Sequence, residues 1–273
     1  MVWIVCMNKP ARLAVTIQKG GVGKTTTAIN VAGALNERGR DVLLIDLDPQ
    51  GAATEGLGFA REYDAEPPSL FDVLTDASQR EQLSELIVEH EEMDVVPSNI
   101  DMTAAEPELT LARRGGEQLS LALDAVEKMY DYMIIDCPPY LGYLTDNGLY
   151  AAQDVLIPAL AESTSKRALE LLFDHIESLE LDYDVSFTER GVIANRVEQT
   201  NEATAMLEWF NDAFPDVPVW EIRKRVALQR AFAAGCSIFE YNPDLDMADQ
   251  YRTIASSLDA QYGFVSESRV RVD

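Results

Sequence analysis

The sequence predicts a single α/β domain, with a doubly wound, mainly parallel sheet and helices on both of its faces. Short apolar runs alternate with helical patterns along the whole chain, which is typical of this class. Several runs, such as Val42–Ile45, are apolar at every position, as expected for strands that are buried on both faces of a parallel sheet. The chain has 273 residues, of which 47% are hydrophobic, enough for one large domain.

The first predicted strand, Leu13–Ile17, leads into the string QKGGVGKTTT at Gln18–Thr27. A strand, a glycine-rich turn and a helix form the context that a phosphate-binding loop requires. Glycine lets the backbone N–H groups turn inward, and the helix N-terminus adds the positive end of its dipole. We expect Lys24 to bind the β- and γ-phosphates of a nucleotide and the Thr25 hydroxyl to bind Mg²⁺.

The loop contains a second lysine, Lys19. The common pattern G-x-x-x-x-G-K-[ST] requires glycine where this chain has Gln18, but the variant K-G-G-x-G-K-T-T fits at every position. Two lysines from one chain at one triphosphate would be redundant, whereas a lysine that reaches the triphosphate of a second subunit would not be. The alternative is a solvated loop lysine beside flexible glycines.

The next elements place two carboxylates at the end of a buried strand. A helix is predicted over Thr26–Arg38 and a strand over Asp41–Asp46, followed by Asp48-Pro49-Gln50-Gly51. Ligands of open α/β sheets bind at the carboxyl ends of the strands. One of the pair Asp46 and Asp48 can therefore position Mg²⁺ through water, and the other can orient an attacking water. A polar turn that begins at Asp48-Pro49 is the alternative.

The middle of the chain carries weaker signals. It predicts a mobile loop at Phe59–Glu66, a strand at Met93–Ser98, and helices at Ser69–Leu74, Arg80–Glu89 and Leu109–Met129, the last interrupted at Gly115-Gly116. Further buried strands are predicted at Asp154–Leu160, Gly191–Val197 and Val217–Ile222.

A third chemical element is the apolar strand Tyr130–Asp136, which ends in aspartate. This is a Walker B pattern, in which Asp136 would hold Mg²⁺ through its water shell. Pro138 and Pro139 fix an extended exit that would lead the chain past the nucleotide. We interpret Cys137 as a packing residue rather than a reactive thiol.

These strings resemble one family. Lys19–Thr26 is similar to the deviant Walker A box of the ParA/MinD ATPases, and Asp46–Thr54 (D-x-D-P-Q-G-x-x-T) is similar to the Walker A′ box of ParA proteins. The D-x-P-P string and a C-terminal G-x-x-x-x-E-Y-x-P are also ParA/Soj-like, and the resemblance covers about residues 12–260. It implies a P-loop ATPase fold, ATP and Mg²⁺ as cofactors, and an ATP-sandwich homodimer.

The resemblance also implies roles for single residues. Lys19 would act in trans, Lys24 at the phosphates and Asp48 in hydrolysis, while Thr25, Asp46 and Asp136 would serve the metal. An asparagine just past a strand commonly contacts adenine in this family, which would be the role of Asn195; an Asx turn is the alternative. The implied nucleotide-binding set is Lys19, Gly20, Gly21, Val22, Gly23, Lys24, Thr25, Thr26 and Asn195.

Charge distribution gives a second signal. The formal net charge is −25, yet Met1–Asn36 and Ile222–Phe239 contain no acidic residue. The second window carries four cations, which predict an electropositive patch for a polyanion such as double-stranded DNA. An amphipathic helix with arginines along its rim is the alternative. The ParA/Soj resemblance implies non-specific DNA binding near this segment. The candidate DNA-binding residues are Arg223, Lys224, Arg225 and Arg230.

The acidic composition and scarce lysine, six of 22 basic residues, favour a host with molar internal salt, and an ordinary acidic cytosolic protein is the alternative. Three cysteines without a C-x-x-C pair argue against a disulfide framework and a zinc or iron–sulfur site. No apolar run is long enough to span a membrane. We expect a cytoplasmic, nucleoid-associated protein with an extension (1–11), an ATPase domain (12–262) and a tail (263–273).

Taken together, the sequence predicts a DNA-partitioning ATPase that dimerises on ATP binding, binds DNA non-specifically, and moves cargo through a ParB-like or other adaptor protein. The alternative is a MinD-like membrane-associated ATPase, which needs a C-terminal amphipathic helix that residues 263–273 do not supply. An iron–sulfur carrier would need paired cysteines. Positioning of another cargo by the same DNA-binding engine stays open, because cargo choice resides in the partner.

Overall fold

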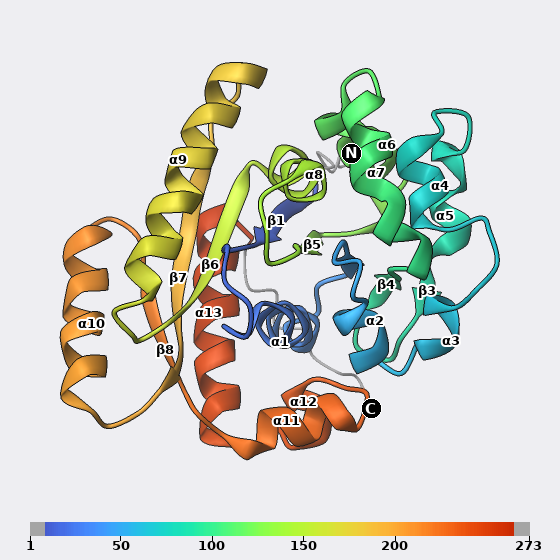
Figure 1. Ribbon diagram of the computed structural model, residues 1–273. Helices are drawn as coiled ribbons and strands as arrows, with labels where there is room; N and C mark the ends of the chain where they lie inside the picture. Colours follow the sequence, from blue (N-terminus) through green and yellow to red (C-terminus); the bar gives the residue numbers. More distant parts are fainter. Residues whose placement is uncertain (1–8, 265–273) are drawn as a thin grey trace, which may run out of the picture.

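The computed structural model describes residues 9–264, and its centre is one eight-stranded sheet (Figure 1). The strand order is β3-β4-β2-β5-β1-β6-β7-β8, and every neighbouring pair is parallel except β3 and β4. The predicted fold class is therefore confirmed. The strands are β1 Ala11–Val15, β2 Val42–Asp46, β3 Val88–Glu89, β4 Asp94–Val96, β5 Tyr132–Asp136, β6 Asp154–Leu160, β7 Thr188–Val197 and β8 Val219–Arg223.

Helices cover both faces of the sheet (Figure 1). One apolar layer packs α1 and the C-terminal helices against the sheet, and a second layer packs the helices that follow β4, β5, β6 and β7. The helices are α1 Lys24–Glu37, α2 Ala52–Gly56, α3 Ala60–Tyr63, α4 Leu70–Thr75, α5 Leu83–Leu86, α6 Ala105–Leu111, α7 Gln118–Leu123, α8 Tyr143–Ala152, α9 Ser165–Tyr183, α10 Asn201–Ala213, α11 Val226–Ala233, α12 Ile238–Tyr241 and α13 Asp246–Tyr262, with 3₁₀ turns η1 Arg80–Gln82, η2 Ile100–Ala104, η3 Gly115–Glu117 and η4 Glu127–Met129.

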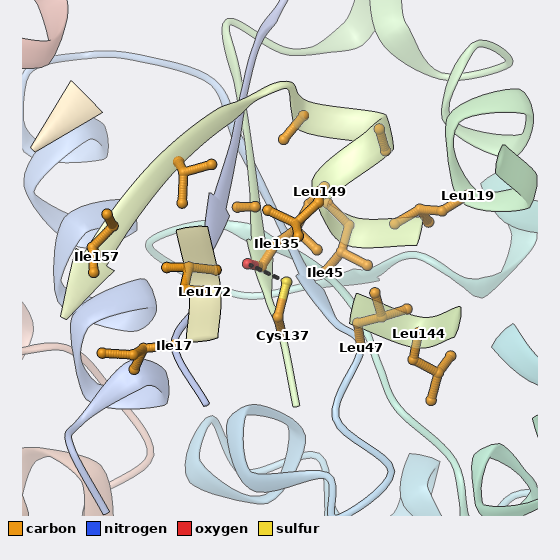
Figure 2. Packing of buried hydrophobic residues seen from close by; sticks show 14 of the residues in the cluster. Ile17, Ile45, Leu47, Leu119, Ile135, Cys137, Leu144, Leu149, Ile157 and Leu172 are labelled. Atoms are coloured by element: carbon orange, nitrogen blue, oxygen red, sulfur yellow. Dashed lines mark hydrogen bonds between the residues drawn. The ribbon is translucent and has the colours of Figure 1, made fainter. Parts of the chain in front are cut away.

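Cys137 lies in the second of these layers (Figure 2). Its side chain is fully buried among Ile45, Leu47 and Leu149, and its Sγ lies 3.8 Å from the carbonyl oxygen of Ile135. Burial raises the pKa of the thiol far above its usual range, so the nucleophilic thiolate is disfavoured. The interpretation of Cys137 as a packing residue is confirmed.

Two of the predicted helices are wrong in part. Arg80–Glu89 is helical only as far as Leu86, because the β-branched Ile87 and Val88 turn into an extended segment that pairs with β4. Leu109–Met129 is broken into short pieces. Arg114 takes the left-handed conformation with φ 62°, and a Cβ on Gly115 would lie 2.0 Å from the carbonyl oxygen of Leu109.

The predicted loop at residues 59–66 contains the short helix α3, which is anchored beside the site. The Tyr63 hydroxyl donates a hydrogen bond to the carbonyl oxygen of Pro49 at 2.7 Å, and its ring fills the space next to Gly51. Position 51 needs glycine twice over, because its φ is 63° and a Cβ would lie 2.4 Å from the Tyr63 ring. Phe59–Glu66 thus contains a helical turn that Tyr63 anchors, although none of its residues is buried.

The domain limits expected from the sequence, 1–11, 12–262 and 263–273, stay predictions. Strand β1 begins at Ala11, one residue inside the predicted extension, and residues 1–8 lie outside the described part. Phe264, in the predicted tail, stacks on Tyr132 with ring centroids 5.0 Å apart. The rest of the tail, 265–273, lies outside the described residues. Within 9–264, no helix combines the length and apolarity that crossing a membrane requires.

Candidate nucleotide-binding site

The glycine-rich loop connects β1 to α1 at the edge of the sheet where the parallel strands end. Gly21 and Gly23 have φ values of 74° and 93°, a region that residues with a Cβ rarely adopt. A Cβ on Gly23 would also lie 3.0 Å from Nδ2 of Asn195. Helix α1 begins at Lys24, directly after the loop, so its free N–H groups face the same space as the glycines.

Lys24 is buried at the base of this loop. Its Nζ donates a hydrogen bond to the carbonyl oxygen of Lys19 at 3.2 Å. Burial lowers the pKa of the amine, while the neighbouring carboxyls of Asp136 and Asp48 oppose that shift. The structure therefore brings together Lys24 and the two carboxylates that the sequence assigned to the same site.

Asp46 and Asp136 end two adjacent strands and are direct partners in the β2–β5 register. Asp46 is fully buried, and its carboxylate accepts hydrogen bonds from the Thr54 N–H (2.7 Å), the Thr54 hydroxyl (2.7 Å) and the Asp48 N–H (3.2 Å). Burial raises the pKa of Asp46 to about 7 despite these donors. Asp46 thus stabilises, through these hydrogen bonds, the loop that carries Asp48. The sequence did not predict this structural role.

Asp136 has weaker partners. Both of its carboxylate oxygens are buried and accept no hydrogen bond of normal geometry among the described residues, although the Thr25 hydroxyl and the Lys24 ammonium lie close enough to lower its pKa. Burial, and next the nearby Asp46, raise its pKa well above the usual range. A buried carboxylate that Lys24 compensates only in part is costly, so Asp136, with Asp46 beside it, fits a divalent cation. Asp136 and the Thr25 hydroxyl carry oxygen atoms of the kind that Mg²⁺ prefers, and their role as its ligands stays a prediction.

Asp48 is nearly buried, and its side chain lines the cavity described next. Its Oδ1 accepts a hydrogen bond from the Gln50 N–H at 3.0 Å, and its carbonyl oxygen accepts one from the Ser98 hydroxyl at 2.8 Å. These contacts fix the turn around Asp48 while the side chain faces the open space. The polar turn considered from the sequence is therefore present, since the Asp48 carbonyl oxygen also accepts a hydrogen bond from the Gly51 N–H at 2.9 Å. A role of Asp48 in orienting water stays a prediction, which its place on the cavity wall supports.

A cavity of about 470 Å³ opens beside the loop, which suits a nucleotide-sized ligand. One end is formed by Gly20–Thr26 and Asp48, and the other end comes from the carboxyl ends of β7 and β8 and from the segment that continues into α11. Sequence reasoning missed much of this second end, although the rule that ligands bind at the carboxyl ends of parallel strands pointed to it. Pro139 lines the cavity, as expected of an exit that passes the nucleotide, and the lining residues not assigned from the sequence are Ala52, Arg196, Ile222, Leu228, Gln229 and Phe232.

Asn195 lies at the end of β7 and lines this cavity. Its Nδ2 donates hydrogen bonds to the carbonyl oxygen of Val22 at 2.9 Å and to the hydroxyl of Thr27 at 3.1 Å. The side chain therefore ties β7 to the phosphate loop, which is neither of the roles considered from the sequence. A contact between Asn195 and a base remains a prediction.

The four candidate DNA-binding cations do not form one free patch. Lys224 pairs with Glu198 at 2.8 Å, and Arg225 pairs with Asp246 at 2.7 Å. Arg223 and Arg230 are exposed and make no ion pair with the residues described here. The sequence window at 222–239 contains no acid, but the fold brings carboxylates to it from elsewhere in the chain. Arg223, Lys224 and Arg225 also line the cavity.

Lys19 contacts its own chain. Its Nζ donates a hydrogen bond to the Thr164 hydroxyl at 2.6 Å and lies 3.6 Å from a carboxylate oxygen of Glu162. The alternative of a solvated, unpaired loop lysine does not describe this arrangement. The role in trans that the resemblance implies for Lys19 stays a prediction.

A separate cluster of His90, Glu92 and Glu240 has the residue types of a metal site. Both nitrogens of the His90 ring are already used: Nε2 donates to the carbonyl oxygen of Gly235 at 3.0 Å, and Nδ1 accepts from the Glu92 N–H at 3.2 Å. The Glu92 carboxylate accepts hydrogen bonds from the N–H and the hydroxyl of Ser237. The cluster fits a structural tie between the β3–β4 turn and α12, not a metal ligand set.

A lysine-bearing phosphate loop that faces strand-terminal carboxylates, on a doubly wound sheet, places the molecule among the P-loop ATPases. The model of the family described as "AAA domain" matches residues 11–188. The sporulation initiation inhibitor protein Soj of Bacillus subtilis is 36% identical over 251 residues, covering 91% of this chain and 98% of Soj. The chain belongs to this family, that of the ParA/Soj partitioning ATPases.

Two further matches agree in fold and sequence. The chromosome partitioning protein ParA of Caulobacter vibrioides is 38% identical over 197 residues, covering 69% of this chain and 70% of that protein. The solved structure of cobyrinic acid a,c-diamide synthase from Mycobacterium smegmatis, with bound ADP and magnesium, has a TM-score of 0.79 and 32% identity, covering 93% of this chain and 96% of that one.

Proposed function

We propose that the protein is an ATPase that dimerises on binding ATP, binds DNA without sequence preference, and partitions or positions a chromosome, plasmid or other cargo through an adaptor protein. The observation that carries the proposal is the juxtaposition of Lys24 with Asp48 and Asp136 beside a phosphate loop that bears a second lysine. The relatedness to Soj and ParA supports the cellular role.

At the nucleotide, each residue has a distinct task. The loop N–H groups and Lys24 would bind the phosphates, and Asp136 with Thr25 would hold Mg²⁺, which neutralises phosphate charge. Asp46 keeps the Asp48 turn in place. Asp48, whose carboxylate faces the cavity, would orient the water that attacks the γ-phosphate. The base would lie at the end of the cavity formed by the carboxyl ends of β7 and β8 and by α11.

The two nucleotide states would differ in their quaternary contacts. Lys19 of each subunit would contact the triphosphate bound to the other, so ATP, but not ADP, favours the closed dimer. Closure would join the exposed Arg223 and Arg230 of both subunits into one DNA-binding face. Slow hydrolysis, stimulated by DNA and a ParB-like or other adaptor, would release the DNA. The protein would then be cytoplasmic and associated with the nucleoid.

The proposal is tested by double-stranded DNA binding in molar KCl with ATP, with ADP and without nucleotide. We expect binding with ATP alone, on unrelated sequences alike. The variant Arg230→Ala should weaken it, and Arg167→Ala is a matched control, because Arg167 is an exposed arginine that pairs with Glu170 on α9. ATP hydrolysis without DNA binding in any state would contradict the DNA-binding part of the proposal.

A further inference from the structure

The side chain of Lys19 is held by the connection between β6 and α9. Thr164 accepts its hydrogen bond at 2.6 Å, and Glu162 lies at 3.6 Å as the counter-charge. The Lys19 side chain is only 23% exposed, although it belongs to a loop at the mouth of the cavity. The backbone of Lys19 is fixed as well, since its carbonyl oxygen accepts the hydrogen bond from Lys24. Both ends of this lysine are therefore tied to its own subunit.

These contacts compete with the proposed function of Lys19, in which its amine binds the phosphates held by a second subunit. A lysine that hydrogen-bonds to Thr164 on its own subunit cannot at the same time contact phosphates on another. The hydrogen bond to Thr164 is charge-assisted and short, which makes it stronger than a neutral one. Glu162 is 54% exposed, so its ion pair with Lys19 is weak enough to be broken by binding.

The side chains of Thr164 and Glu162 make no other described contact that would explain their place beside Lys19. Thr164 precedes α9, but its hydroxyl makes no capping hydrogen bond to that helix. The Glu162 carboxylate has no described contact besides Lys19. Glu162 and Thr164 thus form a contact, called here the holding contact, whose described role is to bind the Lys19 amine.

We propose that Glu162 and Thr164 are positioning residues that hold Lys19 on its own subunit and thereby set the nucleotide concentration at which the dimer closes. The inference rests on the proposed ATP-dependent dimerisation. Nucleotide weakens the hold on Lys19 in two ways. Lys24 gives up its hydrogen bond to the Lys19 carbonyl oxygen when it binds the phosphates. The phosphates bound to the second subunit also attract the Lys19 amine more strongly than Glu162 and Thr164 do. Without this holding contact, Lys19 would be free to cross at lower nucleotide concentration.

The first test measures dimerisation by sedimentation velocity while Mg²⁺ and a non-hydrolysable ATP analogue are titrated. Glu162→Gln and Thr164→Val should each lower the concentration for half-maximal dimer about two- to fivefold, the range expected for a partly exposed pair. Glu170→Gln is the matched control, because it removes an exposed carboxylate from an ion pair on the adjacent helix α9. It should leave the midpoint unchanged.

The second test needs no dimer. Acetylation of nucleotide-free monomer by dilute acetic anhydride, followed by peptide mass spectrometry, reports how available the Lys19 amine is. Glu162→Gln and Thr164→Val should raise acetylation of Lys19 and leave that of Lys166, which packs over Trp209, unchanged. A structural defect of the fold would raise both.

The outcomes separate the inference from the function on which it rests. If wild type dimerises with ATP but the variants match it in midpoint and acetylation, the holding role is wrong. If Glu162→Gln instead raises the midpoint, Glu162 receives the lysine of the partner subunit, and the inference is overturned. A wild-type protein that stays monomeric would contradict the proposed function itself, and the inference with it.

Discussion

Asp46 and Asp136 face each other across β2 and β5 as register partners, and both carboxyls are buried. They differ in their surroundings, because Asp46 accepts three hydrogen bonds and Asp136 accepts none from the described residues. Two neighbouring buried carboxyls cannot both ionise cheaply, and the single charge of Lys24 compensates Asp136 only in part. The nucleotide-free protein therefore stores a destabilising charge arrangement that Mg²⁺ can relieve.

Replacing Asp136 tests this arrangement through stability. The folded carboxyl holds its proton to a higher pH than the unfolded one, so the folded state binds more protons over the interval between the two pKa values. Stability then falls as pH rises above the unfolded pKa of about 4 and until the raised folded pKa of Asp136 is passed. Asp136→Asn has no proton to lose there. It should be more stable than wild type by about 1–3 kcal/mol at neutral pH, and equal to it near pH 4.

Urea unfolding without Mg²⁺ at both pH values measures this difference. The same variant should bind ATP with little response to Mg²⁺, whereas wild type gains affinity when the metal is added. A variant that is less stable than wild type at neutral pH would show that Asp136 has a partner in solution, and would contradict the description of this site.

Gly23→Ala tests the strained turn of the phosphate loop. Alanine at φ 93° is unfavourable, and its Cβ would press on the Asn195 amide, so we expect a loss of about 1–3 kcal/mol in the free energy of unfolding. Gly20→Ala is the control, since its Cβ would meet no atom within 4 Å and its φ is not in the left-handed region. Equal losses in the two variants would argue against the left-handed conformation of residue 23.

Asn195→Ala tests the tie between β7 and the loop. Removal of the amide leaves the Val22 carbonyl and the Thr27 hydroxyl without this donor, and the loop loses its support on that side. ATP affinity, measured by calorimetry, should fall roughly tenfold, the equivalent of one or two hydrogen bonds. Asn195→Asp keeps the size but not the donors and should behave alike; an Asp variant with wild-type affinity would exclude the tie as the cause.

Glu198 and Asp246 are predicted to restrain DNA binding. Each neutralises one cation beside the cavity, Lys224 and Arg225 respectively. Glu198→Gln and Asp246→Asn should therefore strengthen ATP-dependent DNA binding several-fold and steepen its salt dependence. The ATP concentration for half-maximal binding should be unchanged. Weaker DNA binding by both variants would show that these ion pairs build the DNA-binding surface instead of masking it.

Local sequence was sufficient to predict the phosphate loop and the buried strands. The glycines, Lys24 and Thr25 act within ten consecutive residues, and the strands Val42–Asp46 and Tyr132–Asp136 are buried throughout, so their assignments did not depend on distant contacts. The carboxyl ends of these strands meet because a parallel sheet aligns them. The site therefore followed from strand pattern and topology together.

The remaining features depend on contacts between distant segments. No local pattern shows that Asn195 reaches Val22, that Glu198 and Asp246 neutralise cations in an acid-free window, or that Lys19 is held by Thr164. The broken helix near Gly115 likewise reflects the close approach of the Leu109 carbonyl. The interpretation of the acidic composition as an adaptation to high salt is a prediction that the fold does not address.

The most direct test of the account is the mass of the Asp48→Ala variant, measured by light scattering with Mg²⁺ and ATP, with ADP, and without nucleotide. Loss of the carboxylate that would orient water should leave ATP bound and unhydrolysed. We expect a stable dimer with ATP and a monomer in the other two states. A monomer in all three states, in a variant that still binds ATP, would contradict the claim that ATP closes a dimer.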